Sequence, residues 1–186
     1  MKKIVAIHLD ADAEDPTITF LVQENAVARR GCQGDPAKAE KLIREFDGNV
    51  DAIGLQGLPS VLHVGPAQVD HRQGSALLDV AEKTPVVDGG GIRAGLERWG
   101  VILADRAEPG IFSEKRVLMT PGLNHNGLVQ ALERRASSIR YADPFVYFGW
   151  PRMPGVGSGA MLNQVARAEL DRLRQAPFRR IYPQPG

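Results

Sequence analysis

Apolar runs of strand length recur through the first half of the chain and are separated by short polar turns. Ile4 to Leu9 reads IVAIHL, which is typical of a buried strand. Similar runs follow at Thr17 to Val22, Ala26 to Cys32, Val50 to Leu55 and Val61 to Gly65. This region is therefore predicted to be β-rich, and the QEN turn between the second and third runs suggests a hairpin.

Two helices are predicted among these strands. Asp35 followed by Pro36 supplies an N-cap and a first-turn proline, apolar residues then fall on one helical face, and Gly48 ends the helix. A shorter helix is predicted from Ser75, its expected N-cap, to Ala81. The TPVVDGGG segment after it reads as a strand that runs into a glycine-rich turn.

A longer amphipathic helix is predicted next, because apolar residues recur at helical spacing at Ile92, Leu96, Trp99 and Leu103. The segment that follows contains Pro109-Gly110, the strongest linker signal in the chain. We therefore expect an N-terminal α/β domain at residues 1–107 and a second, incomplete or small domain at residues 112–186.

The second domain has the order strand, loop, helix, strand, with the strands at Lys115 to Thr120 and Ser138 to Asp143 and the helix at Leu128 to Ala136. This order is the βαβ rhythm of a parallel sheet, and a C-terminal helix follows it. The predicted fold class is α/β, with a β-rich N-terminal α/β region followed by a Rossmann-like βαβ unit and a mostly parallel sheet.

Composition and charge narrow the choice of partners. The 186 residues include 23 Lys and Arg and 22 Asp and Glu, which gives a net charge of +1. This charge does not indicate binding to nucleic acid or to an anionic membrane surface. No apolar run approaches the roughly 18 to 20 residues that cross a bilayer. The single cysteine, Cys32, can form no internal disulfide. We expect a cytoplasmic protein with a small-molecule substrate, and a homo-oligomer is compatible with this composition.

Three glycine-rich turns precede predicted helices, at Asp88 to Gly91, Gly122 to Gly127 and Gly155 to Gly159. Backbone N–H groups and the positive end of the helix dipole converge at such turns, which suits a phosphate or a carboxylate. Gly89, Gly90 and Gly91 are therefore candidates for anion binding. Glycine is also what tight strand-to-helix turns use, so each turn has an architectural alternative.

The Gly122 to Gly127 turn has the sharper pattern. The three glycine positions of the dinucleotide fingerprint G-x-G-x-x-G fall on Gly122, Asn124 and Gly127, so the middle glycine is replaced. Asp143 follows 16 residues after Gly127 (143 − 127), where an acid would bond a ribose hydroxyl. These four residues are predicted to bind the cofactor NAD or NADP, and an ordinary turn remains the alternative.

One histidine is a candidate catalytic residue. His125 lies in the same turn and could act as a general acid or base near neutral pH, with a solvated loop residue as the alternative. The histidines have no metal-ligand spacing, and no metal site is predicted.

Two strand ends resemble those of the haloacid-dehalogenase-type phosphotransferases. Asp10 and Asp12 close the first strand as LDAD, and Thr120 closes a later one. In such enzymes the first Asp attacks phosphate and carboxylates hold Mg²⁺. No lysine follows Thr120 as those enzymes require, so this resemblance is a minor alternative.

Longer segments together resemble the bacterial and archaeal quinate 5-dehydrogenases. They are RRGCQGDPAKAEKLIREFDGNVDAIGLQG (Arg29 to Gly57), KTPVVDGGGIRAGLERW (Lys83 to Trp99), KRVLMTPGLNHNGLVQALE (Lys115 to Glu133) and APFRRIYPQPG (Ala176 to Gly186). The resemblance implies an α/β protein with a Rossmann-like part that works as an NAD(P)-dependent alcohol oxidoreductase. Members of that family continue past the residues that match Ile181-Tyr182-Pro183, so the chain resembles a truncated member or a fragment. No lysine lies in an SVTxPxK-like setting, so no catalytic base is carried over.

The leading hypothesis is an NAD(P)-dependent oxidoreductase of the quinate/shikimate type that acts on a ring alcohol. The alternative is a non-catalytic α/β ligand-binding or assembly module whose glycine turns are architectural. The minor alternative is a haloacid-dehalogenase-like phosphotransferase.

Overall fold

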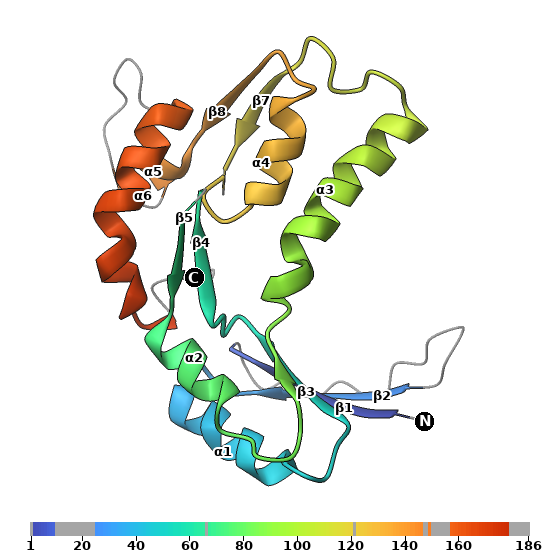
Figure 1. Cartoon of the computed structure of the whole chain (residues 1–186), viewed down its shortest axis with the longest axis vertical. Helices are drawn as coiled ribbons and strands as arrows, with labels where there is room; N and C mark the ends of the chain where they lie inside the picture. The colour runs from blue at the N-terminus through green and yellow to red at the C-terminus, as the bar shows by residue number, and fades with distance from the viewer. Residues whose placement is uncertain are drawn as a thin grey trace. The chain divides into compact units, whose positions relative to one another are not determined.

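The computed structural model describes residues 2–9, 25–65, 67–120, 122–146, 149 and 157–178. The chain is a mixed α/β protein, as predicted (Figure 1). It divides into two compact units, each described by itself below. Unit 1 comprises residues 1–61, 70–90 and 173–186, and unit 2 comprises residues 62–69 and 91–172. The main division therefore lies at residues 90 and 91, whereas the linker signal in the sequence had placed it between residues 107 and 112.

Unit 1 contains a four-stranded sheet in which all the paired strands run parallel. Its order is β2-β1-β3-β6, and the strands are β1 (Lys2–His8), β2 (Asn25–Gly31), β3 (Ala52–Gln56) and β6 (Val86–Val87). β1 therefore has a neighbour on each side, and its residues Val5 and Ile7 are almost fully buried. The apolar run that predicted this strand is the centre of the core of unit 1.

The helix α1 (Pro36–Phe46) lies along this sheet, with α2 (Arg72–Leu78) beside it (Figure 1). Asp35 caps α1 as predicted, because its Oδ1 accepts a hydrogen bond from the Ala37 N–H at 2.9 Å. Ala39 and Ile43 of α1 are fully buried in the same core. The local signals Asp35-Pro36 and Gly48 therefore located this helix correctly.

The N-cap of α2 is His71, not Ser75 as predicted. The His71 Nδ1 accepts the Gly74 N–H at 3.2 Å, and its Nε2 lies 2.7 Å from the Ala176 carbonyl oxygen. The ring is fully buried and packs edge-on to Phe178, with centroids 4.5 Å apart. Because Nδ1 accepts a hydrogen bond it carries no proton, so His71 is a neutral structural cap, and burial lowers its pKa in the same sense.

Unit 2 contains two small sheets. β4 (Val61–Val64) pairs with β5 (Ala67–Asp70), a strand that the sequence did not predict. β7 (Arg116–Met119) and β8 (Ser138–Tyr141) run parallel, with α4 (Asn126–Glu133) between them in the chain. Figure 1 shows α4 alongside these two strands, together with the longer helices α3 (Gly90–Ala107) and α6 (Gly159–Arg174). The predicted parallel βαβ order is therefore present, as a two-stranded sheet in the described residues.

The structure bears on three further expectations from the sequence. The strand from Ala26 is β2, and it pairs in parallel with β1; the proposed hairpin partner, Thr17 to Val22, lies outside the described residues. Asp143 begins a short helix, α5 (Asp143–Val146), instead of ending β8. Within the part of the chain that the structure describes, no helix has both the length and the apolar character needed to cross a membrane.

Candidate functional site

The turn between β7 and α4 holds the residues predicted to bind a cofactor. The backbone N–H groups of Gly122 and Leu123 donate hydrogen bonds to the two carboxylate oxygens of Asp143, at 3.0 and 2.8 Å. Asp143 is fully buried. Burial raises its pKa, against the lowering effect of the two N–H groups. The structure therefore brings Gly122 and Asp143 together. Both carboxylate oxygens of Asp143 already accept hydrogen bonds from the backbone of the turn.

Gly122 is also packed closely against the next strand. A Cβ atom built at this position would collide with the ring of Tyr141, with 2.8 Å to its Cε1 atom, and would lie 3.3 Å from Asp143 Oδ2. Tyr141 is itself buried, which together with the charge of Glu133 raises its pKa to about 12. Glycine is required at residue 122 because the neighbouring ring occupies the space of a side chain.

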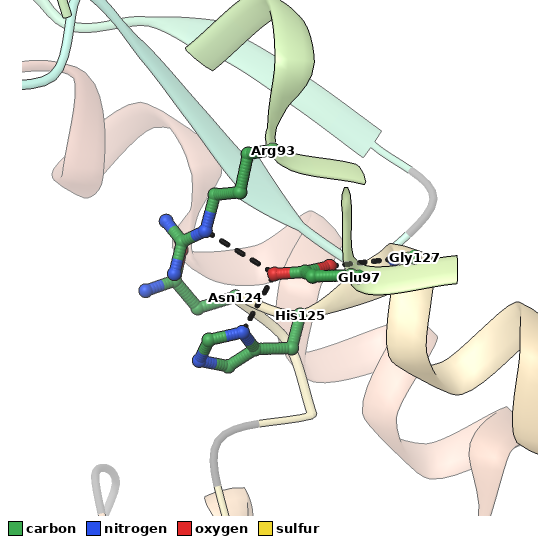
Figure 2. A network of polar contacts seen from close by, with 5 residues as sticks. All are labelled: Arg93, Glu97, Asn124, His125 and Gly127. Carbon is green, nitrogen blue, oxygen red and sulfur yellow. Dashed lines mark hydrogen bonds and ion pairs between the residues drawn. The ribbon is translucent and has the colours of Figure 1, made fainter. Parts of the chain in front are cut away.

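The N-terminus of α4 is closed by a carboxylate from α3. Glu97 Oε2 accepts the Gly127 N–H at 3.0 Å, and Glu97 Oε1 lies 2.7 Å from His125 Nδ1 (Figure 2). A carboxylate is favourable here because the helix N-terminus carries a partial positive charge. The Glu97 side chain is only 12% exposed, so the contact is shielded from solvent.

Arg93 completes this network from one turn earlier on α3. Its Nε donates to Glu97 Oε1 at 3.2 Å, and its Nη1 donates to the side-chain oxygen of Asn124 at 3.2 Å (Figure 2). Asn124, which stands at the middle position of the fingerprint, is therefore bonded to an arginine of the chain. Arg93 and Glu97 were not among the predicted site residues, although their spacing of four residues is the usual signal of a helical ion pair.

Gly127 lies against the backbone of α3 at Ala94. A Cβ atom there would collide with the Ala94 carbonyl oxygen and lie 2.8 Å from both Ala94 Cα and Glu97 Oε2. Its backbone N–H and the space for its side chain are both occupied by α3. The four predicted cofactor residues thus lie in one region, and each has its partner within the chain: Gly122, Asn124, Gly127 and Asp143.

This arrangement does not fit the pyrophosphate of a dinucleotide. A fingerprint loop holds phosphate with backbone N–H groups and lets glycine backbone approach the ligand. Here the N–H groups of Gly122, Leu123 and Gly127 donate to Asp143 and Glu97. A phosphate would have to displace two carboxylates, one of them fully buried.

The turn at Asp88 to Gly91 also has a carboxylate of the chain, that of Asp88, bonded to its backbone. Asp88 Oδ2 accepts from the backbone N–H and the hydroxyl of Ser60, each at 2.7 Å, and Asp88 Oδ1 accepts from the Gly90 N–H at 2.9 Å. Partial burial opposes the charged form, but these hydrogen bonds hold the pKa of Asp88 below its ordinary value. Gly89 and Gly91 have open space at the Cβ position, unlike the glycines of the other turn.

His125 is the predicted site residue whose side chain is suited to acid–base chemistry. Its side chain is 28% exposed while its Nδ1 is fixed by Glu97. When Nδ1 carries the ring proton and donates it to the carboxylate, Nε2 is the basic nitrogen. A carboxylate that orients a histidine in this way is common in sites of general acid–base catalysis.

Of the residues that predicted a phosphotransferase, Thr120 is described and directly follows β7. Asp10 and Asp12 lie outside the described residues. Among the described residues, no group of three or more His, Cys, Asp or Glu side chains is placed to hold a metal ion.

Two family models match the chain, one on each side of the start of α3. Residues 3–88 match a Domain of unknown function (DUF8753), and residues 91–186 match a Domain of unknown function (DUF8754). The junction between the two matches coincides with the division between residues 90 and 91. A search of curated proteins gives no match.

Proposed function

The chain belongs to the DUF8754 family, whose model covers residues 91–186, and we propose that it is an α/β ligand-binding or assembly module whose glycine turns are architectural. The observation that carries this proposal is the bonding of the Gly122 to Gly127 turn. Its N–H groups donate to carboxylates of the same chain, where a nucleotide-binding protein would offer them to phosphate.

The packing of the glycines supports the same proposal. Gly122 lies against Tyr141, and Gly127 lies against Ala94, so both positions are used for close contact between elements of unit 2. In the dinucleotide fingerprint the middle glycine is the one whose backbone approaches the pyrophosphate, and Asn124 stands at that position here. Each glycine of this turn therefore has a structural reason that requires no cofactor.

Calorimetric titration of the purified chain with NAD⁺ and with NADP⁺ tests this proposal. We expect no binding heat and no shift of the melting temperature with either nucleotide. Asn124→Ala serves as a matched variant, because it alters the middle fingerprint position without touching either packed glycine. Saturable binding by the natural chain that Asn124→Ala weakens would place a nucleotide at this turn and overturn the proposal.

A second candidate function is the oxidoreductase implied by the resemblance to quinate dehydrogenases. It is favoured by the pair formed by His125 and Glu97, at 2.7 Å. A bound NAD(P) would supply the hydride acceptor for oxidation of a ring alcohol, and a base of the chain would have to take up the hydroxyl proton. Nε2 of His125 is the atom of this chain suited to hold that proton. The turn does not fit the dinucleotide, so no further step is assigned.

The oxidoreductase is tested by following nicotinamide absorbance with quinate or shikimate as substrate. We expect His125→Gln to abolish any turnover, because glutamine cannot take up the proton. Glu97→Gln would lower the rate and alter its pH profile, since the orientation of the imidazole would change. Activity that persists in His125→Gln would remove this candidate.

A further inference from the structure

The helix α3 has two opposite faces that differ in their contacts. One face meets α4: Ala94 packs against Gly127, Glu97 bonds to its N–H, and Arg98 Nη1 donates to the Gln130 side chain at 3.3 Å. Asp105 extends this face by its contact with Arg135 at 3.4 Å. Because residues of a helix advance by about 100° each, positions two residues away from these lie on the far side.

That far side carries large apolar side chains that remain exposed. They are spaced four, three and four residues apart, and they are Ile92 (66% exposed), Leu96 (61%), Trp99 (51%) and Leu103 (45%). This is the stripe that predicted an amphipathic helix, and Arg106 lies at its C-terminal end, where the guanidinium carbon is 5.7 Å from the centroid of the Trp99 ring. We call these four residues the α3 stripe. Contiguous apolar surface of this kind marks an interaction site more often than a solvated face.

We propose that the α3 stripe is the contact surface between two copies of this chain. The inference rests on the proposed function as a binding or assembly module, and it names the partner. The spacing of four, three and four is that of the a and d positions of paired helices, which pack against a helix with the same pattern. A two-fold interface uses the same patch on both copies, so the patch must complement itself.

Two properties of the stripe meet that requirement. Its four residues are uncharged, and antiparallel pairing with its own copy keeps the two Arg106 side chains at opposite ends, so no like charges come face to face. Gly95 and Gly100 flank it on either side, and a Cβ atom built at either position touches nothing within 4 Å. Within the described part of the chain, these two helix-interior glycines therefore have no packing partner, and they leave room for a second helix to approach closely.

The exposed area of the α3 stripe sets the expected affinity of the dimer. The four half-exposed side chains offer roughly 200–300 Å² of apolar surface per copy. A pair would bury about 400–600 Å² of apolar surface, and about 700–1,000 Å² in total if about 60% of the interface is apolar. This lies at the low end of specific interfaces, so we expect a reversible dimer with a Kd of about 10–100 μM.

Sedimentation of the full chain over about 1 to 500 μM tests this inference. The mass should rise with concentration from the 20.2 kDa of one chain toward twice that value. Leu96→Glu places a charge in the stripe of both copies and should raise the Kd at least about tenfold. Leu118→Glu is the matched control, because Leu118 is 65% exposed on β7 and makes no part of the stripe. Its Kd should equal that of the natural chain.

Circular dichroism of both variants should show that they remain folded, because both changes are at exposed positions. A chain that stays monomeric at every concentration would overturn the inference. So would a dimer that Leu96→Glu leaves intact or that Leu118→Glu also dissolves. A monomer that binds no nucleotide would defeat only this inference, whereas a dimer that binds NAD⁺ at the Gly122 to Gly127 turn would defeat only the proposed function.

Discussion

The glycine turns at Asp88 to Gly91 and at Gly122 to Gly127 are alike in sequence and differ in packing. Each precedes a helix, and each has a carboxylate of the chain bonded to its backbone N–H groups. In the first turn, Gly89 and Gly91 have open space where a Cβ atom would lie. In the second, Gly122 and Gly127 have none, because Tyr141 and Ala94 fill it.

Glycine therefore serves two separate structural purposes in such turns. Gly89 has a φ of +74°, which side chains rarely adopt, so there the backbone conformation explains the residue. At Gly127 the close approach of α3 explains it. Neither use requires a ligand, and a sequence pattern that counts glycines cannot separate these uses from phosphate binding.

The largest expected effect follows from removing the buried carboxylate of the second turn. Asp143→Ala leaves the N–H groups of Gly122 and Leu123 buried without their acceptor. Each unsatisfied group costs about 1–3 kcal/mol, so we expect the free energy of unfolding to fall by about 2–5 kcal/mol. Urea denaturation measures this loss. Asp143→Asn, which keeps one acceptor oxygen, should lose less; equal stability of Asp143→Ala and the natural chain would show that the turn is not held in this way.

A smaller loss is expected when the anion at the N-terminus of α4 is removed. Glu97→Ala takes the acceptor from the Gly127 N–H and the partner from His125, and should cost about 1–3 kcal/mol in unfolding free energy. Glu108→Ala is the control, since Glu108 is exposed just past the end of α3 and its loss should change stability by less than about 0.5 kcal/mol. Equal effects of the two changes would contradict the role given to Glu97.

In the turn at Asp88 to Gly91, replacing a glycine with alanine should raise the stability of the chain. Gly91 is exposed in the first turn of α3, and a Cβ atom there meets nothing within 4 Å. Gly91→Ala should therefore raise the unfolding free energy by about 0.5–1 kcal/mol, because alanine loses less backbone entropy in a helix. Thermal unfolding monitored by circular dichroism would register the gain as a higher Tm. A lower Tm would reveal a contact at this position that the structure does not contain.

The smallest expected difference between the two turns is in how their stability changes at acidic pH. The pKa of Asp88 is lowered in the folded chain, so its contribution to stability is present above its unfolded pKa and is lost as the pH falls. The pKa of Asp143 is raised, so its contribution is present at low pH and is lost as the pH rises through the folded pKa.

Hydrogen exchange, corrected for intrinsic rates, compares the two turns directly. Between about pH 5 and pH 3, protection of the Ser60 and Gly90 amides should fall, while that of the Gly122 and Leu123 amides should persist. Parallel loss of protection in both turns would contradict the opposite pKa shifts.

Much of the fold could be predicted from short-range signals. The helix α1 begins where Asp35-Pro36 places it, because its cap is a contact over two residues. β1, β3 and β7 follow from apolar runs. The cap of α2 could not be predicted, since His71 is fixed by Ala176 and Phe178, which are more than 100 residues away in the sequence.

The candidate site was predicted only in part, for the same reason. Gly122 and His125 were singled out because they are close in sequence to a recognisable pattern. Glu97, which bonds to both His125 and Gly127, lies 28 and 30 residues earlier, and no local signal links it to the turn. The periodicity of α3 predicted its amphipathic character, but it could not say that the apolar stripe is the exposed side.

The stability of Gly127→Ala tests most directly the claim that the Gly122 to Gly127 turn is architectural. The added methyl group would collide with the Ala94 carbonyl oxygen, which belongs to the backbone of α3 and cannot move aside cheaply. We predict that urea denaturation gives an unfolding free energy about 1–3 kcal/mol below that of the natural chain. A variant that is as stable as the natural chain and has instead lost affinity for NAD⁺ or NADP⁺ would contradict the account.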